Sequence, residues 1–190
     1  MVKDIGKEIE EVALSLFNEY GVENVSMHKI AKRAQIGQGT LYRRYSNKSD
    51  LCLSLLEKKW EQLVPDLHTY LSQISDQPVR DRLRYVLVEL NLIVGKHLDW
   101  FRMLTISGNL EQTSRVYDCD YSQSIRQTIK DLLKEAQEKG EATIQDVNLT
   151  TLFMSSPITP EFMFYVNESG YSIKQIAEYA VDMQLQSVFH

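Results

Sequence analysis

Positive charge gathers in residues 26–48 of an otherwise acidic chain. The segment carries six Lys and Arg side chains and no Asp or Glu, while the 190-residue chain has a formal net charge of -5. Residues 51–190 hold 13 Lys and Arg against 19 Asp and Glu. A polyanion would be drawn to one end of such a chain and repelled by the other, so the pattern indicates a nucleic-acid ligand. Charge alone leaves an ordinary solvated surface as the alternative.

The side chains of residues 38–44 suit the edges of DNA bases. Arg43 and Arg44 match guanine O6 and N7, Gln38 matches adenine, and a Thr methyl can touch thymine. Gly39 would let the backbone approach the duplex closely. Lys48 opens the next expected helix, where its charge joins free amides and a positive dipole end, so we expect it to hold a phosphate.

Two short helices are expected to position these residues. Ser26 is a suitable cap for the first, and after the turn "QIG" the second covers residues 38–45. Short helices joined by a three-residue turn form a helix-turn-helix, whose second helix enters the DNA major groove. That helix is too short to be stable alone, so surrounding helices must hold it through Leu41, its strongest aliphatic anchor. One of them is predicted over residues 5–20, ending at Gly21.

The rest of the chain is also predicted to be helical. Apolar residues recur at helical spacing and nothing alternates as in a strand, so the fold class is all-α. Helices are expected after the caps Asn47, Asp76, Asp146 and Ser172, and over residues 97–106 and 111–139. Ser172 and Gln175 form a capping box. Pro65 should kink or end the helix that follows Asn47.

The stretch "VSMHKIAKRAQIGQGTLYRRYSNKSDL" resembles the signature of the TetR family of transcriptional regulators. The residues that carry the resemblance are Ser26, Ile30, Ala31, Ala34, Ile36, Gly39, Thr40, Leu41, Tyr42, Tyr45, Lys48 and Leu51. The resemblance implies that Gln38, Arg43 and Arg44 read bases. It also implies that phosphates are held by Ser26, Thr40, Tyr42 and Lys48. Gln35 stands where the family usually has Gly, so Gln35 is expected in a left-handed conformation or in a slightly different turn. Gly37 replaces the usual hydroxyl cap.

The resemblance further implies two domains: residues 1–47 as a three-helix DNA-binding domain, and residues 48–190 as a larger helical domain for effector binding and dimerisation. The partners are then an operator in double-stranded DNA, a second copy of the chain and a small-molecule effector. Pairing is expected through the last two helices, with an interface formed by Ile173, Ile176, Ala177, Ala180, Val181 and Leu185. The alternative is that this apolar band closes the core of the monomer. Pro157 and Pro160 predict a break or kink before the final helix.

An effector pocket is expected within residues 60–165. Its predicted lining is aromatic, apart from one methionine: Trp60, Tyr85, Trp100, Phe101, Met103, Tyr117, Tyr121 and Phe153. Such residues also fill ordinary cores, which is the alternative for each of them singly. Together they favour an aromatic or lipophilic effector.

Other classes of function find little support in the sequence. Asp118, Cys119 and Asp120 cannot converge on one metal ion, because residues i and i+2 of a helix point apart. No phosphate loop, dinucleotide fingerprint or nucleophile elbow is present, so neither an enzyme nor a cofactor is expected. Two distant cysteines are expected as reduced thiols, and no membrane span or signal-peptide core is seen, so we expect a cytoplasmic protein. The resulting prediction is a ligand-responsive regulator, a repressor released by its effector. The alternative is a DNA-binding adaptor of the same fold controlled by a protein partner.

Overall fold

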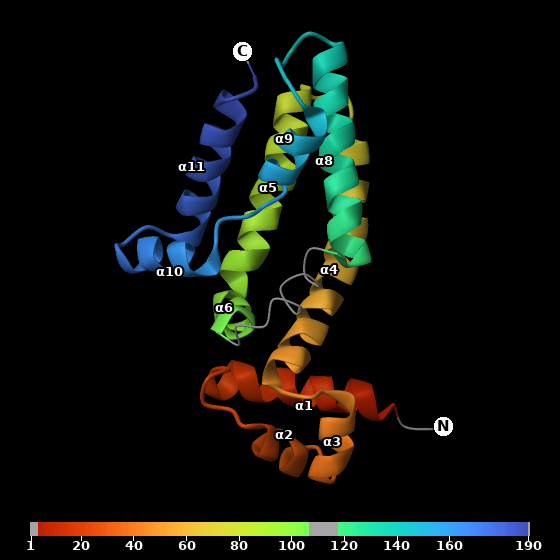
Figure 1. Cartoon of the computed structure of the whole chain (residues 1–190), viewed down its shortest axis with the longest axis vertical. Coiled ribbons are helices and arrows are strands. Elements are labelled where there is room, and N and C mark those ends of the chain that lie inside the picture. Colours follow the sequence, from red (N-terminus) through yellow and green to blue (C-terminus); the bar gives the residue numbers. More distant parts are fainter. Residues whose placement is uncertain (1–3, 107–117, 190) are drawn as a thin grey trace. The chain divides into compact units, whose positions relative to one another are not determined.

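The computed structural model describes residues 4–106 and 118–189, and these residues fold into helices without a β-sheet (Figure 1). An isolated bridge joins Ala142 and Phe189. The predicted all-α fold class is confirmed. The described residues divide into two compact units: residues 4–59 with 99–106, and residues 60–98 with 118–189. One helix contributes to both units, so they do not follow the boundary expected at residues 47/48, which stays a prediction.

The first unit is built on α1 (Ile5–Tyr20), α2 (Met27–Arg33) and α3 (Gln38–Arg44). Asp4 caps α1 by accepting hydrogen bonds from the Gly6 and Lys7 amides, at 3.0 and 3.4 Å. Ser26 caps α2 as predicted, accepting from the amide of Lys29 at 3.2 Å. Gly21 ends α1 at a φ of 76°, a conformation that favours glycine. These local signals fix where each helix starts and stops.

The long helix α4 (Lys48–Gln73) belongs to both units and contains Pro65. Pro65 does not end the helix, so that half of the expectation is wrong. Proline removes a single backbone donor, and the helix continues because Leu67, beyond the proline, is buried at 2% exposure. The next helix, α5 (Val79–Lys96), has Pro78 at its N-cap position, so the expected cap Asp76 is also wrong.

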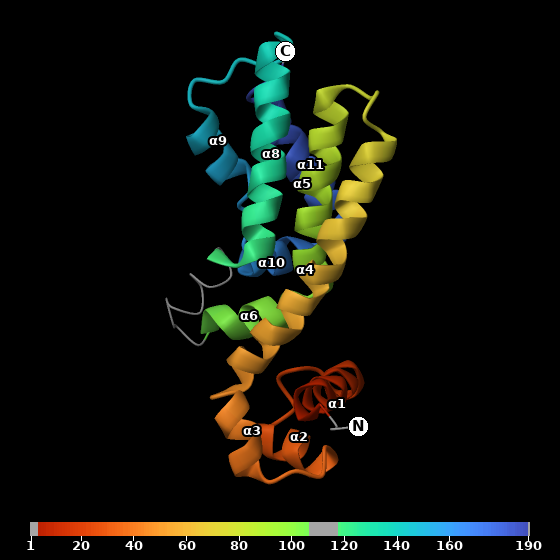
Figure 2. The same cartoon turned by 90° about the vertical axis from the view of Figure 1, so that its right-hand side faces the viewer.

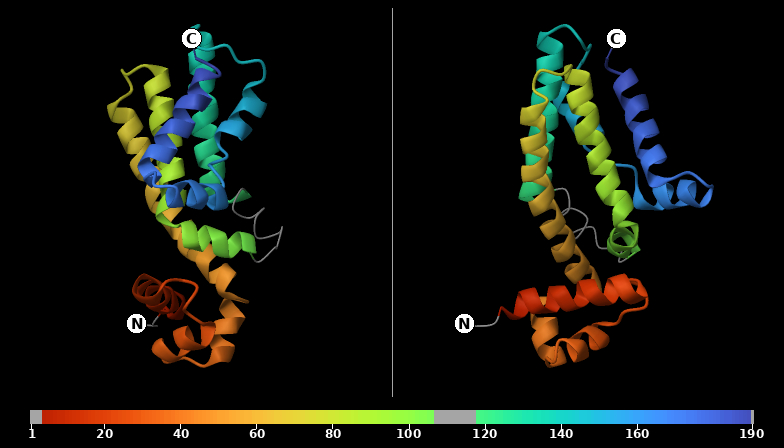
Figure 3. Two further views of the ribbon diagram at one scale, coloured as in Figure 1. Left: turned by 90° about the vertical axis from the view of Figure 1, so that its left-hand side faces the viewer. Right: turned by 180° about the vertical axis from the view of Figure 1, so that it is seen from behind.

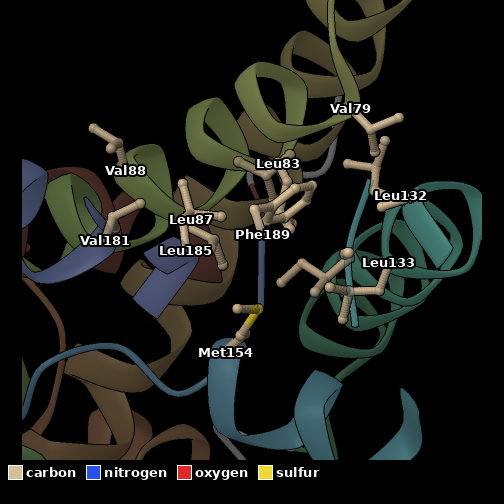
Figure 4. Packing of buried hydrophobic residues seen from close by; sticks show 14 of the residues in the cluster. Val79, Leu83, Leu87, Val88, Leu132, Leu133, Met154, Val181, Leu185 and Phe189 are labelled. Carbon is tan, nitrogen blue, oxygen red and sulfur yellow. The ribbon is translucent and has the colours of Figure 1, made fainter. Parts of the chain in front are cut away.

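The second unit is held by apolar packing between α5, α8 (Asp120–Glu138) and α11 (Ile173–Gln186) (Figure 2). Figure 4 shows Leu83 and Leu87 of α5 meeting Leu133 of α8 and Leu185 of α11. Ion pairs join the same helices: Arg82 pairs with Glu135, and Arg84 pairs with Asp182 through Nε and Oδ1 at 2.7 Å.

The long helix predicted over residues 111–139 is interrupted. Cys119 has an extended backbone and stands at the N-cap of α8, which ends at Glu138. The predicted segment 111–117 lies outside the described residues. A separate short helix, α6 (Leu98–Ile106), matches the one predicted over residues 97–106.

A break separates α9 (Val147–Met154) from α10 (Pro160–Glu168), as the two prolines predict. Thr159 caps α10 and Pro160 occupies its first turn. The amide of Ile158 donates to Asn91 Oδ1 at 2.9 Å, and Asn91 Nδ2 donates to the Leu87 carbonyl at 2.9 Å. The buried Asn91 therefore ties the linker to α5. As a result α10 lies crosswise to the start of α11 (Figure 3).

Candidate nucleic-acid interface

The turn between α2 and α3 sets the direction of the second helix. Gln35 has a φ of 55°, so the predicted left-handed residue is confirmed. The Gln35 amide donates to the Lys32 carbonyl at 3.2 Å, and the Ile36 amide donates to the Ala31 carbonyl at 3.0 Å. These two bonds form a Schellman motif, which usually places glycine where Gln35 stands. The turn thus carries a strain of about 1 kcal/mol that other contacts must offset.

Helix α3 has one buried side and one open side. Leu41 is 0% exposed, and Tyr45, its C-cap residue, is 6% exposed. Gln38, Tyr42 and Arg43 are exposed, Tyr42 at 47%. The structure thus presents the three predicted base readers, Gln38, Arg43 and Arg44, and the predicted phosphate ligand Tyr42 as exposed side chains.

Gly39 lies on the same helix, in open space. A Cβ atom added at Gly39 would meet no heavy atom within 4 Å. The fold itself therefore does not require glycine there, although glycine weakens a helix by about 1 kcal/mol relative to alanine. A close approach by something outside the monomer gives a physical reason for its presence.

His28 of α2 contacts Gln38, and sequence analysis did not single it out. Its Nδ1 lies 2.5 Å from Gln38 Nε2, so neutral His28 accepts a hydrogen bond from the amide. The contact holds a predicted adenine reader in a defined orientation. The sequence gives no sign of this contact, because His28 and Gln38 lie on different helices and are brought together only by the turn between α2 and α3.

Arg44 is exposed, but its guanidinium points back toward α1. A Cβ atom built on Gly6 would lie 2.1 Å from Arg44 Nη2 and 2.4 Å from its Cζ. The guanidinium thus packs against the N-terminal turn of α1, where only a glycine leaves it room. In this conformation Arg44 braces α3 on α1, and its predicted contact with bases stays a prediction.

Lys48 also contacts another part of the monomer. Its Nζ donates to the carbonyls of Val22, Glu23 and Val25, at 2.7, 3.3 and 3.0 Å. An ammonium group has three donors, and all three are used by the loop between α1 and α2. Lys48 therefore ties this loop to the start of α4, and its predicted phosphate contact stays a prediction.

Three cations of α2 supply positive charge that the sequence analysis counted without assigning. Lys29 lies over the ring of Tyr20, with Nζ 3.1 Å from the centroid. Lys29, Lys32 and Arg33 line a surface hollow of about 420 Å³ together with Leu16, Tyr20 and Gln35. In a helix-turn-helix the first helix crosses the DNA backbone, a position that suits these cations.

Comparison with known proteins identifies the family of this helix-turn-helix. The family model described as "Bacterial regulatory proteins, tetR family" matches residues 9–55. This segment, which contains α1, α2, α3 and the start of α4, is therefore similar to the DNA-binding part of TetR-family transcriptional regulators. An HTH-type transcriptional regulator of Staphylococcus aureus (strain USA300) is 29% identical over 186 residues, covering 98% of this chain and 95% of the relative. Homologous regulators of this kind are DNA-binding proteins and not enzymes.

Solved structures of other regulators share the fold of this chain. FadR from Bacillus subtilis, in complex with stearoyl-CoA, is similar with a TM-score of 0.65 and 19% identity, covering 94% of this chain and 97% of FadR. RolR in complex with resorcinol is similar with a TM-score of 0.69 and 18% identity, covering 98% of this chain and 88% of RolR.

The predicted effector-lining residues do not share one environment. Trp60, Trp100 and Phe101 are buried at 4–8% exposure, whereas Phe153 is 71% exposed. Tyr85, Met103 and Tyr121 are partly buried, and Tyr117 lies outside the described residues. Trp100 packs edge-on against Phe17 of α1, with centroids 6.2 Å apart, so it contributes to the core of the first unit.

The predicted dimer contacts are mostly used inside the monomer. Ile176, Ala177, Val181 and Leu185 are 0–7% exposed, and Val181 and Leu185 belong to the core of the second unit. These four side chains are thus largely used inside the monomer, and their predicted part in an interface stays a prediction. Ile173 and Ala180 are partly buried. The apolar side chains of α9–α11 that are more than half exposed, at 52–71%, form what we call the exposed apolar set: Leu149, Leu152, Phe153, Phe162, Tyr165, Tyr179 and Met183.

Three further observations concern the described residues alone. They contain no group of three or more His, Cys, Asp or Glu side chains arranged to hold a metal ion. None of their helices combines the length and apolarity needed to cross a membrane. Cys52 and Cys119 are free thiols, and burial raises the pKa of Cys52 to about 12.

Proposed function

We propose that α3 is the recognition helix of this regulator, with Gln38 and Arg43 reading base edges in the major groove. Ser26, Thr40 and Tyr42 then hold the flanking phosphates, joined by the cations of α2. The observation that carries the proposal is the open side of α3, where exposed Gln38, Tyr42 and Arg43 surround a glycine that the fold does not need.

Selection of bound fragments from random DNA tests this proposal. Wild-type protein should enrich one sequence, and Arg43→Ala should bind it about 1–3 kcal/mol more weakly and tolerate other bases at one position. Lys134→Ala on α8 is the matched control, since it removes one exposed cation from the other unit and should leave the preference unchanged. An unaltered preference in the Arg43 variant would exclude this residue as a base reader.

We propose that the protein acts as a homodimer through the exposed apolar set of α9–α11. Within each helix these residues share a face: Leu149 with Leu152 and Phe153, Phe162 with Tyr165, and Tyr179 with Met183. Large exposed apolar surfaces mark interaction sites. A second copy also satisfies the need for two recognition helices, roughly 34–36 Å apart on DNA.

Sedimentation velocity tests the dimer. Tyr179→Lys should shift the protein toward monomer and weaken operator binding while helicity by circular dichroism stays unchanged. Tyr70→Lys serves as the control, because Tyr70 is an exposed tyrosine of α4 outside this set. Dimers of undiminished stability in the Tyr179 variant would refute the assignment of this face.

We propose further that a small aromatic or lipophilic effector binds the second unit and releases the operator, making the protein a repressor that acts in the bacterial cytoplasm. The fold is that of FadR and RolR, whose solved complexes contain stearoyl-CoA and resorcinol. An effector acts this way only if it binds the released state more tightly than the DNA-bound state. Stearoyl-CoA and resorcinol are the first probes: release of bound operator and a higher melting temperature would support an effector of that class. If neither probe has any effect, the effector is of another class.

A further inference from the structure

A buried carboxylate lies where three helices of the first unit meet. Glu10 of α1 is 7% exposed. Its Oε1 accepts hydrogen bonds from Tyr45 Oη at 3.0 Å and from Ser54 Oγ at 2.7 Å, and its Oε2 accepts one from Lys58 Nζ. Tyr45 is the C-cap residue of α3, whereas Ser54 and Lys58 lie on α4. One side chain therefore joins α1, the end of α3 and α4.

The group is ionised at neutral pH. Burial would raise the pKa of Glu10, but hydrogen bonds from Lys58, Ser54 and Tyr45 outweigh burial, and the pKa is lowered. The pKa of Lys58 is raised, chiefly by its hydrogen bond to Glu10. Both oxygens of the carboxylate are thus satisfied by donors, which makes the arrangement directional.

Helix α3 has few buried attachments; Arg44 against Gly6 and Gln38 at His28 are contacts of exposed side chains. It has seven residues, its only buried residue is Leu41, and its N-cap Gly37 offers no side-chain hydrogen bond. At the other end the amide of Tyr45 donates to the Leu41 carbonyl at 2.9 Å. A helix this short does not hold its own shape in water, so its direction depends on its anchors. The hydrogen bond from the Tyr45 hydroxyl to Glu10 adds a directional contact to the apolar packing of the Tyr45 ring.

A buried ion pair is a poor source of stability, since an apolar replacement of the same volume often serves as well. Orientation is what the charged network adds. We infer that Glu10 is a positioning residue for operator recognition: through Tyr45 it sets the angle at which α3 meets the duplex, and through Ser54 and Lys58 it couples that angle to α4. The inference rests on the proposal that α3 is the recognition helix.

Glu10→Gln and Tyr45→Phe test this positioning role. The first keeps the shape but loses the charge, and the second removes only the hydroxyl. Both variants should bind the selected operator about tenfold more weakly, by the scale of a charge-assisted hydrogen bond, while binding to random DNA and its salt dependence stay unchanged. Lys58→Arg, which keeps the donor, should bind nearly as wild type. Glu11→Gln is the matched control: Glu11 is the next residue of α1, 67% exposed, and its nearest cation is Lys7 at 3.9 Å.

Hydrogen exchange of α3 amides supplies a second readout that does not depend on DNA. Exchange should accelerate in α3 for both variants and stay unchanged in α8 and α11. Equal losses of specific and random binding, or wild-type operator affinity in both variants at temperatures where they are folded, would overturn the inference. Unchanged exchange in α3 would do the same. A wild-type protein that enriches no DNA sequence would instead refute the proposed function, while the exchange data would still decide whether Glu10 orders α3.

Discussion

Alanine at Gly39 should strengthen the fold and weaken DNA binding. Gly39 is the second residue of α3, and a Cβ atom there would meet nothing within 4 Å, so the monomer accepts the methyl group without a clash. Replacing glycine by alanine in a helix gains up to about 1 kcal/mol. For a chain of this length that gain raises the melting temperature by about 2–4 °C.

The effect on DNA has the opposite sign. If α3 lies in the major groove with Gly39 toward the duplex, the added methyl group occupies space that the DNA backbone or base edges need. Inserting a methyl group into a packed contact costs about 1–3 kcal/mol. The middle of that range corresponds to a dissociation constant about thirtyfold larger. The two quantities are measured by thermal denaturation at fixed protein concentration and by fluorescence anisotropy on the selected operator.

Gly37→Ala provides the comparison. Gly37 also faces open space, but it stands at the N-cap of α3, where alanine is less favourable than glycine, so this variant should melt at a lower temperature. If affinity simply followed stability, the Gly39 variant would bind DNA better than wild type and the Gly37 variant worse. Stronger or unchanged operator binding by the Gly39 variant would show that this edge of α3 does not approach the duplex.

Three other substitutions or treatments probe contacts described above. Gly95→Ala should destabilise the second unit by about 1 kcal/mol net, because the added Cβ atom would lie 2.0 Å from Ile173 Cγ2. Ile173→Ala in the same chain should recover part of this loss in a double-mutant cycle. Additive losses would show that the clash is not formed. Lys48→Met should lower the free energy of unfolding by about 1–3 kcal/mol and leave the salt dependence of DNA binding unchanged. A salt dependence reduced by about one phosphate contact would instead support the predicted contact between Lys48 and DNA. With a thiol reagent at pH 8, Cys119 should react in the native protein and Cys52 only after unfolding, since burial holds Cys52 protonated with a pKa of about 12; equal rates at both cysteines would contradict that burial.

Local chemistry explains which parts of the fold were predictable. Caps depend on neighbours within a few residues, so Ser26, Asp146 and Ser172 begin helices as expected. The left-handed conformation of Gln35 could be predicted because Gln35 stands at a turn position where the TetR family usually has glycine. The break before Pro160 followed from proline's missing donor and its fit to the first turn of a helix.

The contacts that the sequence did not predict are those between residues distant in the sequence. Lys48 bonds to carbonyls 23–26 residues away, and Arg44 rests against Gly6. Neither contact has a recognisable sequence pattern, so the sequence analysis considered both positively charged side chains only as DNA ligands. Glu10 escaped notice for the same reason: on α1 it is one acidic residue among several, and only the fold brings Tyr45 and Lys58 to it.

Helix α11 has two apolar sides, whereas the sequence analysis considered a single apolar band that would form either the dimer interface or the core of the monomer. Ala177, Val181 and Leu185 follow one another at intervals of four and face the core. Tyr179 and Met183 stand two residues from these positions, about 200° around the helix, and are 71% and 57% exposed.

A helix that only closed its own core would present polar side chains on that outer side. Packing inside the monomer takes the more regular aliphatic stripe, which is the one that sequence periodicity detects first. The larger and more polarisable side chains are left outside, and these residue types are the ones enriched at protein interfaces. The proposed dimer surface therefore consists of the apolar residues that the core does not use. The apolar residues of a helix must be sorted into those that face the core and those that face outward before an interface can be proposed.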